Sequence, residues 1–318
     1  MSNQPLNSEA PNSQAPNSEP LSVAVIGAGA LGGYFGALLQ QAGHRVHFTA
    51  RGAHLDALRA HGLRITGQTE CTLPVDVTED PARIGPVDLV LLAVKATQLD
   101  EVLPGLVPLL GEQTAVVTLQ NGVEAPSRVA EALGRGHVLP GIVRVYTRIA
   151  QPGVIDHMGG PGSITLAEWD NAATGRVAAI RRALETAGVP SPVPDDIWQD
   201  LWHKVMFVVP TGLLGALAQA PLGVQRTDLR ENLAAIMAEV RAVGQAQGVE
   251  LADAVEQTLA FADRMPAEAT TSMHRDLAAG IPGELDPLVG GVRRLGRQAG
   301  VRTPLFDLGH ALLERRQP

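Results

Sequence analysis

Residues 21–51 read LSVAVIGAGALGGYFGALLQQAGHRVHFTAR, a pattern that predicts a strand, a glycine-rich turn, a helix and a second strand in succession. The first strand is apolar and β-branched, as in a buried parallel sheet, and it stops at Gly27. In Gly27-x-Gly29-x-x-Gly32 the glycines allow a tight turn, backbone approach to a pyrophosphate, and close packing of the helix on the strand. The phosphates would lie at the N-terminal end of the helix. Five residues are the expected cofactor contacts: Gly27, Gly29, Ala30, Leu31 and Gly32.

The end of the second strand indicates which dinucleotide is bound. A site that prefers NAD usually has Asp or Glu about 20 residues after the first glycine. Residues 47–51 are HFTAR and contain no acid. Arg51 can pair with a 2′-phosphate through its planar guanidinium, and no carboxylate in this segment repels that phosphate. The prediction is NADPH/NADP+, with Arg51 as a cofactor contact; the alternative is an ordinary solvated arginine.

Length and composition exclude several classes of protein. The chain has 318 residues, which is long for one domain and sufficient for two. Its net charge of −8 argues against a nucleic-acid partner, because such partners bind basic surfaces. The single cysteine, Cys71, excludes an intramolecular disulfide and fits a reducing compartment. No segment predicts a membrane span or a signal peptide, so we expect a cytoplasmic protein without a membrane partner.

The N-terminal segment differs in composition from the rest of the chain. Residues 1–20, MSNQPLNSEAPNSQAPNSEP, contain almost no apolar side chains. Such a segment cannot bury enough surface to offset the entropy lost on ordering. We expect a disordered tail.

Lys95 and Asn121 each come where an apolar strand is expected to stop. One strand covers about 87–94 and the next about 115–119. In open parallel sheets, ligands bind outside the carboxyl ends of the strands. Both residues are therefore candidates for contact with cofactor and substrate. The alternatives are a solvated loop lysine and a common Asn-Gly turn.

The patterning changes character near residues 190–195. Before it, a further strand is expected at about 138–145, and short runs at 154–157 and 164–166 predict an added antiparallel pair. After it, the pattern is almost entirely helical. The predicted fold class is α/β, with an N-terminal Rossmann-type doubly wound sheet followed by an all-α C-terminal domain. The expected domains are an NADP-binding domain, residues 21–192, and a helical substrate and catalytic domain, residues 193–318.

A lysine lies among apolar residues in the first helix of the second half. The segment 197–205, IWQDLWHKV, has helical apolar spacing, and Lys204, Val208 and Gly212 stack on one face because they are four residues apart. Pro210 cannot donate to the carbonyl four residues before it, so a kink or local opening is expected there. A lysine in apolar surroundings is costly unless it snorkels, pairs or takes part in chemistry. Amphipathicity alone favours snorkelling.

Six motifs together resemble a known family. They are Gly27-x-Gly29-x-x-Gly32, Val94-Lys95-Ala96-x-Gln98, Gln120-Asn121-Gly122, Leu201-Trp202-x-Lys204, Thr271-Ser272-Met273-x-x-Asp276 and Gly283-Glu284-Leu285-Asp286. In this order and spacing, the chain after residue 20 closely resembles the ketopantoate reductases (2-dehydropantoate 2-reductases). The resemblance implies a Rossmann domain, a helical domain and an active site between them. It also implies NADPH-dependent reduction of the 2-keto group of ketopantoate to pantoate, for pantothenate and coenzyme A synthesis.

The resemblance implies a role for each matched residue. Lys204 would be the general acid that protonates the alkoxide, and Glu284 the acid that orients Lys204 and the substrate hydroxyl. Lys95 and Asn121 would line the nicotinamide and substrate, and Ser272 would bind the substrate carboxylate. The set is chemically consistent, because hydride addition to a 2-oxo acid concentrates charge on one oxygen, which a positioned ammonium can stabilise and then protonate.

Two positions depart from the family pattern. Val208 and Gly212 stand where the family typically has asparagines, and the lost amides would have favoured hydroxylated substrates. Thr211 is a candidate for partial compensation. Two alternatives therefore stay open: a paralogous NADPH-dependent reductase of a less polar 2-oxo acid, and a non-catalytic NADP(H)-binding sensor. The nine histidines show no metal-ligand pattern, and the helical half is compatible with a homodimer.

Overall fold

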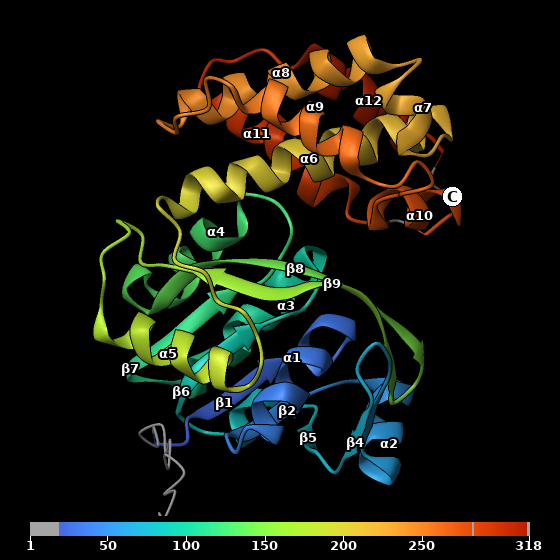
Figure 1. Cartoon of the computed structure of the whole chain (residues 1–318). Helices are drawn as coiled ribbons and strands as arrows, with labels where there is room; N and C mark the ends of the chain where they lie inside the picture. The colour runs from blue at the N-terminus through green and yellow to red at the C-terminus, as the bar shows by residue number, and fades with distance from the viewer. Residues whose placement is uncertain (1–18, 282, 317–318) are drawn as a thin grey trace, which may run out of the picture.

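The computed structural model describes residues 19–281 and 283–316. The tail predicted for residues 1–20 lies outside the described residues except for its last two. Figure 1 shows two parts, a sheet covered by helices in the first half of the chain and a cluster of helices in the second. After β9 the described chain forms helices and turns and contains no strand. The predicted fold class is confirmed.

Six strands form a parallel run with the order of a dinucleotide-binding sheet. They are arranged as β5 (Asp76–Thr78), β2 (Arg45–Thr49), β1 (Ser22–Ile26), β6 (Val87–Leu92), β7 (Leu110–Thr118) and β8 (Val138–Gln151). Numbered along the chain, these six strands lie in the order 3-2-1-4-5-6. The order reverses beside β1, where Val23 is opposite Val46 on one side and Leu89 on the other. The carboxyl ends of the strands at this reversal bound the crevice in which such folds bind ligands.

The sheet continues beyond β8 with strands of mixed direction. β8 pairs antiparallel with β9 (Val154–Leu166), which pairs parallel with β3 (Leu63–Gly67), and β4 (Cys71–Leu73) forms the edge. The expected pair of short strands at 154–157 and 164–166 is wrong, because both segments belong to β9 and pair with β8. Gly159 and Gly160 have φ of +127° and +91°. These glycines let β9 bulge and continue where the sequence suggested a break.

Alternate side chains of β1 enter different cores on the two faces of the sheet. Val23 and Val25 pack with apolar residues of α1, α2 and α5, whereas Ala24 and Ile26 pack with residues of α3, η3 and α4. Burial on both faces explains the continuous apolar runs of these strands. The covering helices are α1 (Ala30–Gln41), α2 (Gly52–His61), α3 (Leu99–Val102), the 3-10 segment η3 (Leu103–Leu109), α4 (Ala125–Leu133) and α5 (Gly175–Thr186).

The second part of the chain is built around α6 (Ile197–Ala218). The helices that accompany it are α7 (Leu222–Arg226), α8 (Arg230–Ala246), α9 (Ala254–Arg264), α10 (Ser272–Ala278), a π-helical turn (Asp286–Gly290), α11 (Gly291–Gln298) and α12 (Pro304–Glu314). In Figure 1, α6 runs between these helices and the end of the sheet that carries β8 and β9. By length and composition α6 is apolar enough to span a membrane, but 67% of its most apolar window is buried inside the protein. Core packing therefore accounts for its composition. The helix continues through Pro210.

Candidate active site between the sheet and the helices

The turn after β1 requires glycine at two positions. Gly27 has φ +95°, and its N–H donates to Oγ1 of Thr49 at 2.9 Å. A Cβ on Gly32 would lie 2.2 Å from the carbonyl oxygen of Gly27 and 2.8 Å from Cγ1 of Val25. Helix α1 therefore lies directly against the turn, as the third glycine of the motif predicts.

The first turn of α1 fits a dinucleotide phosphate. Its N-cap, Gly29, makes no side-chain capping bond, and no acidic residue lies in the first turn. The first N–H groups of a helix have no partner within the helix, so an anion can accept hydrogen bonds from them. A Cβ on Gly29 would meet nothing within 4 Å, so this side of the turn is open.

Arg51 has an acidic neighbour that the sequence did not suggest. It precedes α2 at the end of β2 and forms an ion pair with Glu101 of α3. The segment 47–51 itself contains no acid, as the sequence showed, and the carboxylate comes from a segment 50 residues away. The two side chains are 55% and 60% exposed. Such an exposed pair contributes little, so a 2′-phosphate can replace Glu101 as the partner of Arg51.

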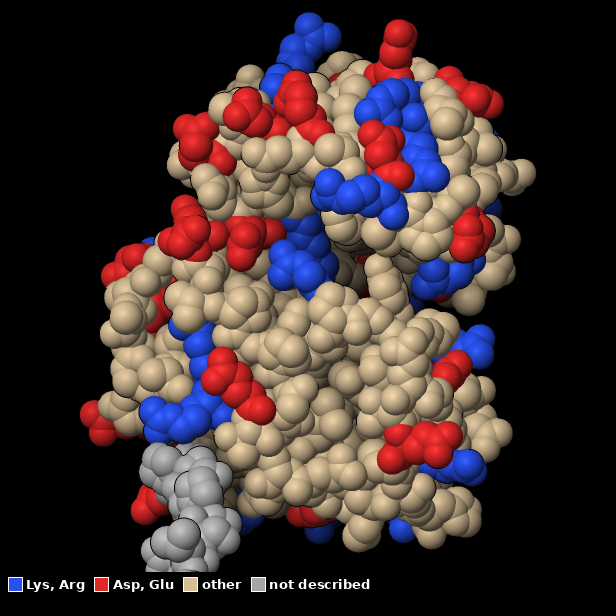
Figure 2. Space-filling model, viewed as in Figure 1, with Lys and Arg blue, Asp and Glu red and all other residues tan. Residues whose placement is uncertain are grey.

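Lys204 lies in a pocket between α6 and the sheet. The side chain of Asp196 caps α6 by accepting the N–H of Trp198 at 2.8 Å, which fixes where the helix begins. The loop after β7, the middle of β8 and α6 supply the lining of the pocket: Gln120, Asn121, Gly122, Gly141, Ile142, Leu201, Lys204, Val205, Val208 and Val209. The fold therefore brings Asn121 and Lys204 together. Figure 2 shows a hollow where the two parts meet, with Lys and Arg side chains beside it.

Lys204 is the most strongly perturbed lysine of the site. Its pKa falls from 10.5 to about 8, first because burial removes water from the ammonium, then because Arg144 repels its charge. The carboxylate of Glu284 acts in the opposite direction and raises the pKa. The side chain of Lys204 is half-buried and lines the pocket, so its ammonium is within reach of a ligand there. A lysine with this pKa is well suited to donate a proton near neutral pH.

Two contacts join the turn after β6 to the helical part. Oε1 of Glu284 accepts a hydrogen bond from the backbone N–H of Ala96 at 3.2 Å. Next to it, Nζ of Lys95 lies 3.3 Å from Oδ2 of Asp276 on α10. Gln120 also stabilises this turn, because its side-chain amide donates to the carbonyl oxygens of Leu92 and Val94 at the end of β6. These contacts fix Glu284 at a distance from which its charge acts on Lys204.

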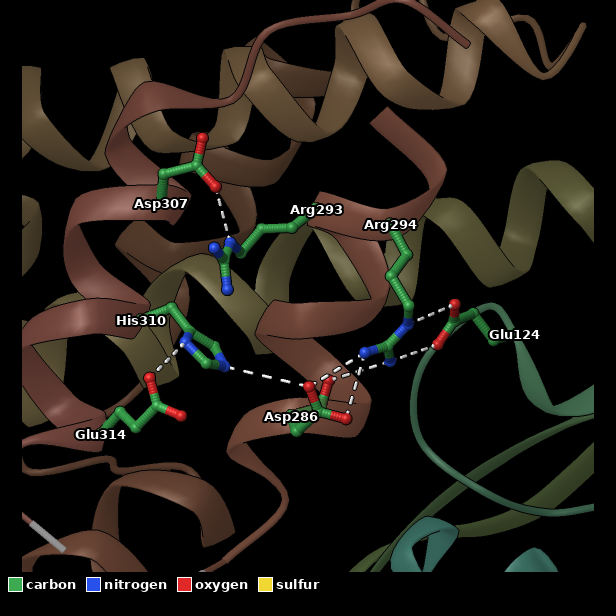
Figure 3. A network of polar contacts seen from close by, with 7 residues as sticks. All are labelled: Glu124, Asp286, Arg293, Arg294, Asp307, His310 and Glu314. Atoms are coloured by element: carbon green, nitrogen blue, oxygen red, sulfur yellow. Dashed lines mark hydrogen bonds and ion pairs between the residues drawn. The ribbon is translucent and has the colours of Figure 1, made fainter. Parts of the chain in front are cut away.

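A third contact connects the loop that carries Asn121 to the helical part. Figure 3 shows Glu124 of this loop facing Arg294 of α11. Arg294 donates from Nε to Oε1 of Glu124 at 3.0 Å and from Nη2 to Oε2 at 2.8 Å, and from Nη1 to Oδ1 of Asp286 at 2.9 Å. These carboxylates raise the pKa of Arg294 above its usual value. The two-pronged geometry sets the position of the Asn121 loop relative to α6.

Like Lys95 and Glu284, Ser272 is a predicted site residue that does not line the pocket with Lys204. It is exposed in the first turn of α10 and does not line the pocket formed by the described residues. α10 is held against α6 at Gly212, where a Cβ would lie 2.6 Å from Cε of Met273 and 2.9 Å from Oγ1 of Thr271. An asparagine at position 212 would therefore require the side chains of Met273 and Thr271 to move.

The other departures from the family pattern make this side of the pocket apolar. Val208 lines the pocket one turn after Lys204. The hydroxyl of Thr211 donates to the carbonyl oxygen of Phe207 at 2.5 Å. Thr211 thus bonds within its own helix and does not line the pocket, and its partial compensation for the missing amides stays a prediction.

Arg144 is a neighbour of Lys204 that sequence reasoning missed. It lies on β8 as the single charged residue of the segment 138–147. This isolated charge in an apolar strand was a usable signal, because an unexplained charge in a half-buried strand is unusual. Without the fold, nothing connected it to a helix 60 residues further on.

Comparison with protein families gives matches along nearly the whole described chain. The model described as Ketopantoate reductase PanE/ApbA matches residues 23–171, and the model described as Ketopantoate reductase PanE/ApbA C terminal matches residues 196–317. The chain belongs to the ketopantoate reductase family. It is therefore an oxidoreductase of the 2-dehydropantoate 2-reductase type.

Individual members of the ketopantoate reductase family resemble the chain over most of their length. A 2-dehydropantoate 2-reductase of Mesorhizobium japonicum is 32% identical, over 93% of this chain and 97% of the relative. The crystal structure of a PanE/ApbA family ketopantoate reductase from Ralstonia eutropha has a TM-score of 0.84 at 32% identity, covering 93% of this chain and 98% of that one. A D-mandelate dehydrogenase solved with NADH and anilino(oxo)acetate has a TM-score of 0.82 at 23% identity, with coverage of 93% and 98%. This last likeness concerns the fold alone.

Proposed function

We propose that this chain reduces the 2-keto group of 2-dehydropantoate (ketopantoate) to pantoate with NADPH, a step of pantothenate and coenzyme A synthesis. The observation that carries the proposal is the half-buried Lys204, whose pKa is lowered to about 8, in a pocket it shares with Asn121. The relatives named as 2-dehydropantoate 2-reductases support the same assignment. The pocket lies between residues 21–192 and 193–318, which we infer to be the cofactor-binding and helical domains.

In this proposal Lys204 is the general acid. Its ammonium stabilises the negative charge that develops on the keto oxygen and then donates a proton to it. Glu284 keeps a larger share of Lys204 protonated, because its carboxylate raises the pKa of the lysine. Asn121 and Lys95 follow β7 and β6, and from there they line the nicotinamide and substrate side. Ser272 stays a predicted contact of the substrate.

The cofactor in this proposal is NADPH. The turn at residues 27–32 holds the pyrophosphate, and Arg51 exchanges Glu101 for the 2′-phosphate. When bound, the nicotinamide supplies the hydride for the keto carbon. The chain itself positions the substrate, excludes water and delivers the proton.

The test is turnover by the purified full-length chain, followed as NADPH oxidation. Ketopantoate is compared with less hydroxylated 2-oxo acids, NADH with NADPH, and Lys204→Met with the unaltered protein. We expect ketopantoate to be the best substrate, NADPH the better cofactor, and the variant to lose turnover while it still binds NADPH. Preference for the less polar acids would contradict the substrate assignment. NADPH binding without turnover on any 2-oxo acid would contradict the reaction.

A further inference from the structure

Arg144 occupies a defined position on β8. From Gly141 to Arg144 the register with β9 is unbroken, with Ile142 opposite Thr165 and Arg144 opposite Ser163. Side chains along a strand alternate between the two faces of a sheet. Val143 packs in the core of the sheet, whereas Ile142 packs in the core of the helical part with residues of α6. Arg144, two residues beyond Ile142, therefore points to the side of α6 and of Lys204.

The guanidinium of Arg144 has no acidic partner among the residues that the structure describes. Its side chain is half-buried, and it takes part in none of the side-chain hydrogen bonds or ion pairs formed within residues 19–281 and 283–316. By contrast, Arg148 on the same strand is paired with Asp156 at 2.9 Å. Half-buried arginines are usually paired, because their N–H groups need acceptors. Arg144 thus presents a charged, planar donor set on the side of β8 that faces α6, two residues beyond Ile142, which lines the pocket of Lys204.

The charges at this place do not balance. Lys204 and Arg144 are two cations, and Glu284 is the carboxylate whose charge acts on Lys204. Two cations beside one carboxylate leave a net positive charge in a half-buried place, which favours an anionic ligand. A 2-oxo acid carries its carboxylate on the carbon next to the keto group, so it presents two oxygen-bearing groups side by side.

We propose that Arg144 binds the carboxylate of the 2-oxo acid substrate, while Lys204 takes the keto oxygen. This inference rests on the proposed function and adds the residue that recognises the acid group. The planar guanidinium matches a carboxylate through two parallel N–H bonds. It also explains how a pocket lined by Val208, in place of a family asparagine, still holds a polar substrate. Selection for the acid group then depends on Arg144 more than on the exposed Ser272.

The test compares an acid with a matched compound that lacks the carboxylate. Ketopantoate and ketopantoyl lactone, its cyclic ester, carry the same keto group, and both are assayed with NADPH on the unaltered protein, Arg144→Met and Arg144→Lys. We expect Arg144→Met to raise KM for ketopantoate by about 10- to 100-fold, the usual loss for a charged hydrogen-bond pair, and to change the lactone by less than about threefold. Arg144→Lys keeps the charge without the planar geometry and should fall between the two.

Two further variants and one further readout make the result specific. Arg148→Met is the matched control on the same strand and should behave as the unaltered protein, and Ser272→Ala should change the ratio of acid to lactone less than Arg144→Met does. Removal of the Arg144 charge should also move the pH profile of the lactone reaction to higher pH, because that charge lowers the pKa of Lys204. A change in packing alone would not move the profile in this direction. NADPH titration of each variant shows that the cofactor site is intact.

The outcomes separate this inference from the function on which it rests. Turnover of neither keto compound by the unaltered protein would overturn the reductase assignment and this inference together. An active protein in which Arg144→Met keeps the preference for the acid would overturn the role of Arg144 alone. A loss of that preference in Ser272→Ala and not in Arg144→Met would assign the carboxylate to α10.

Discussion

Replacement of Lys204 by methionine is expected to stabilise the protein at pH 7 while it abolishes turnover. The pKa of this lysine falls from 10.5 to about 8 in the folded chain. One pKa unit corresponds to about 1.4 kcal/mol, so a difference of roughly 2.5 sets a cost of about 3 kcal/mol for holding the charged form in the pocket. Methionine has a similar length, carries no charge and adapts to irregular space. The free energy of unfolding of Lys204→Met should therefore rise by up to this amount.

The gain should shrink as the pH rises. Below pH 8 Lys204 is charged in both folded and unfolded chains, so the full cost is present. Between about pH 8 and 10.5 the folded chain releases the proton while the unfolded chain keeps it, so the unfolded state binds more protons and the unaltered protein gains stability with pH. The advantage of methionine is thus largest at neutral pH and smallest above about pH 10.5.

Urea unfolding followed by tryptophan fluorescence measures this difference at neutral and at alkaline pH. Lys95→Met is the matched control, because the side chain of Lys95 is 57% exposed and paired with Asp276. Its effect on the free energy of unfolding should be under about 1 kcal/mol. A Lys204→Met protein that is less stable than the unaltered chain at pH 7, by an amount independent of pH, would refute the reasoning. It would mean that ionic partners stabilise the ammonium by more than burial costs.

Three further predictions follow from the site. The rate of reduction should fall as pH rises through the pKa of Lys204 near 8, and Glu284→Gln, which removes the charge that raises this pKa, should move the fall to lower pH in a pH–rate profile. Gly32→Ala would place a Cβ 2.2 Å from the carbonyl oxygen of Gly27, so the free energy of unfolding measured in urea should drop by about 1–3 kcal/mol or more. The control is Gly29→Ala at the N-cap of α1, which should cost far less because nothing lies within 4 Å of the added Cβ. Arg51→Gln should lower the affinity for NADPH about 10- to 100-fold in fluorescence titrations and leave the affinity for NADH unchanged. Glu101→Gln should raise the affinity for NADPH a few-fold, because Arg51 loses its competing partner. Equal effects on both cofactors would argue against a 2′-phosphate site.

The cofactor half was predictable because its signals are local. The glycine turn, the helix it opens and the strand that follows are adjacent in sequence, and each has its own steric requirement, such as the contact of Gly32 with the turn. Continuous apolar runs also predict buried parallel strands. Their carboxyl ends could be located in the same way, and the structure places Asn121 in the pocket with Lys204.

The features that sequence reasoning missed all depend on contacts between distant segments. Glu101 pairs with Arg51 across 50 residues, and the charge of Arg144 acts on Lys204 across 60. Periodicity carries no information on which loop or strand lies beside a given side chain. Thr211 shows a related limit, because its hydroxyl has a partner in its own helix that competes with any role in the pocket. Segment 154–166 was split because glycines usually end strands, and here they bend one.

The hydrogen bond between Glu284 and the backbone of Ala96 makes the strength of the acid a property of the assembled molecule. The lysine and its carboxylate come from the helical part, but the N–H that holds the carboxylate in place comes from the sheet. A folding intermediate or a fragment that contains the helices alone would carry Lys204 without its cover and without a fixed counter-charge. Its ammonium would then titrate as an ordinary exposed lysine. Lys204 can therefore act as the proton donor only when the two parts have docked, so an incompletely folded chain is expected to have no reductase activity.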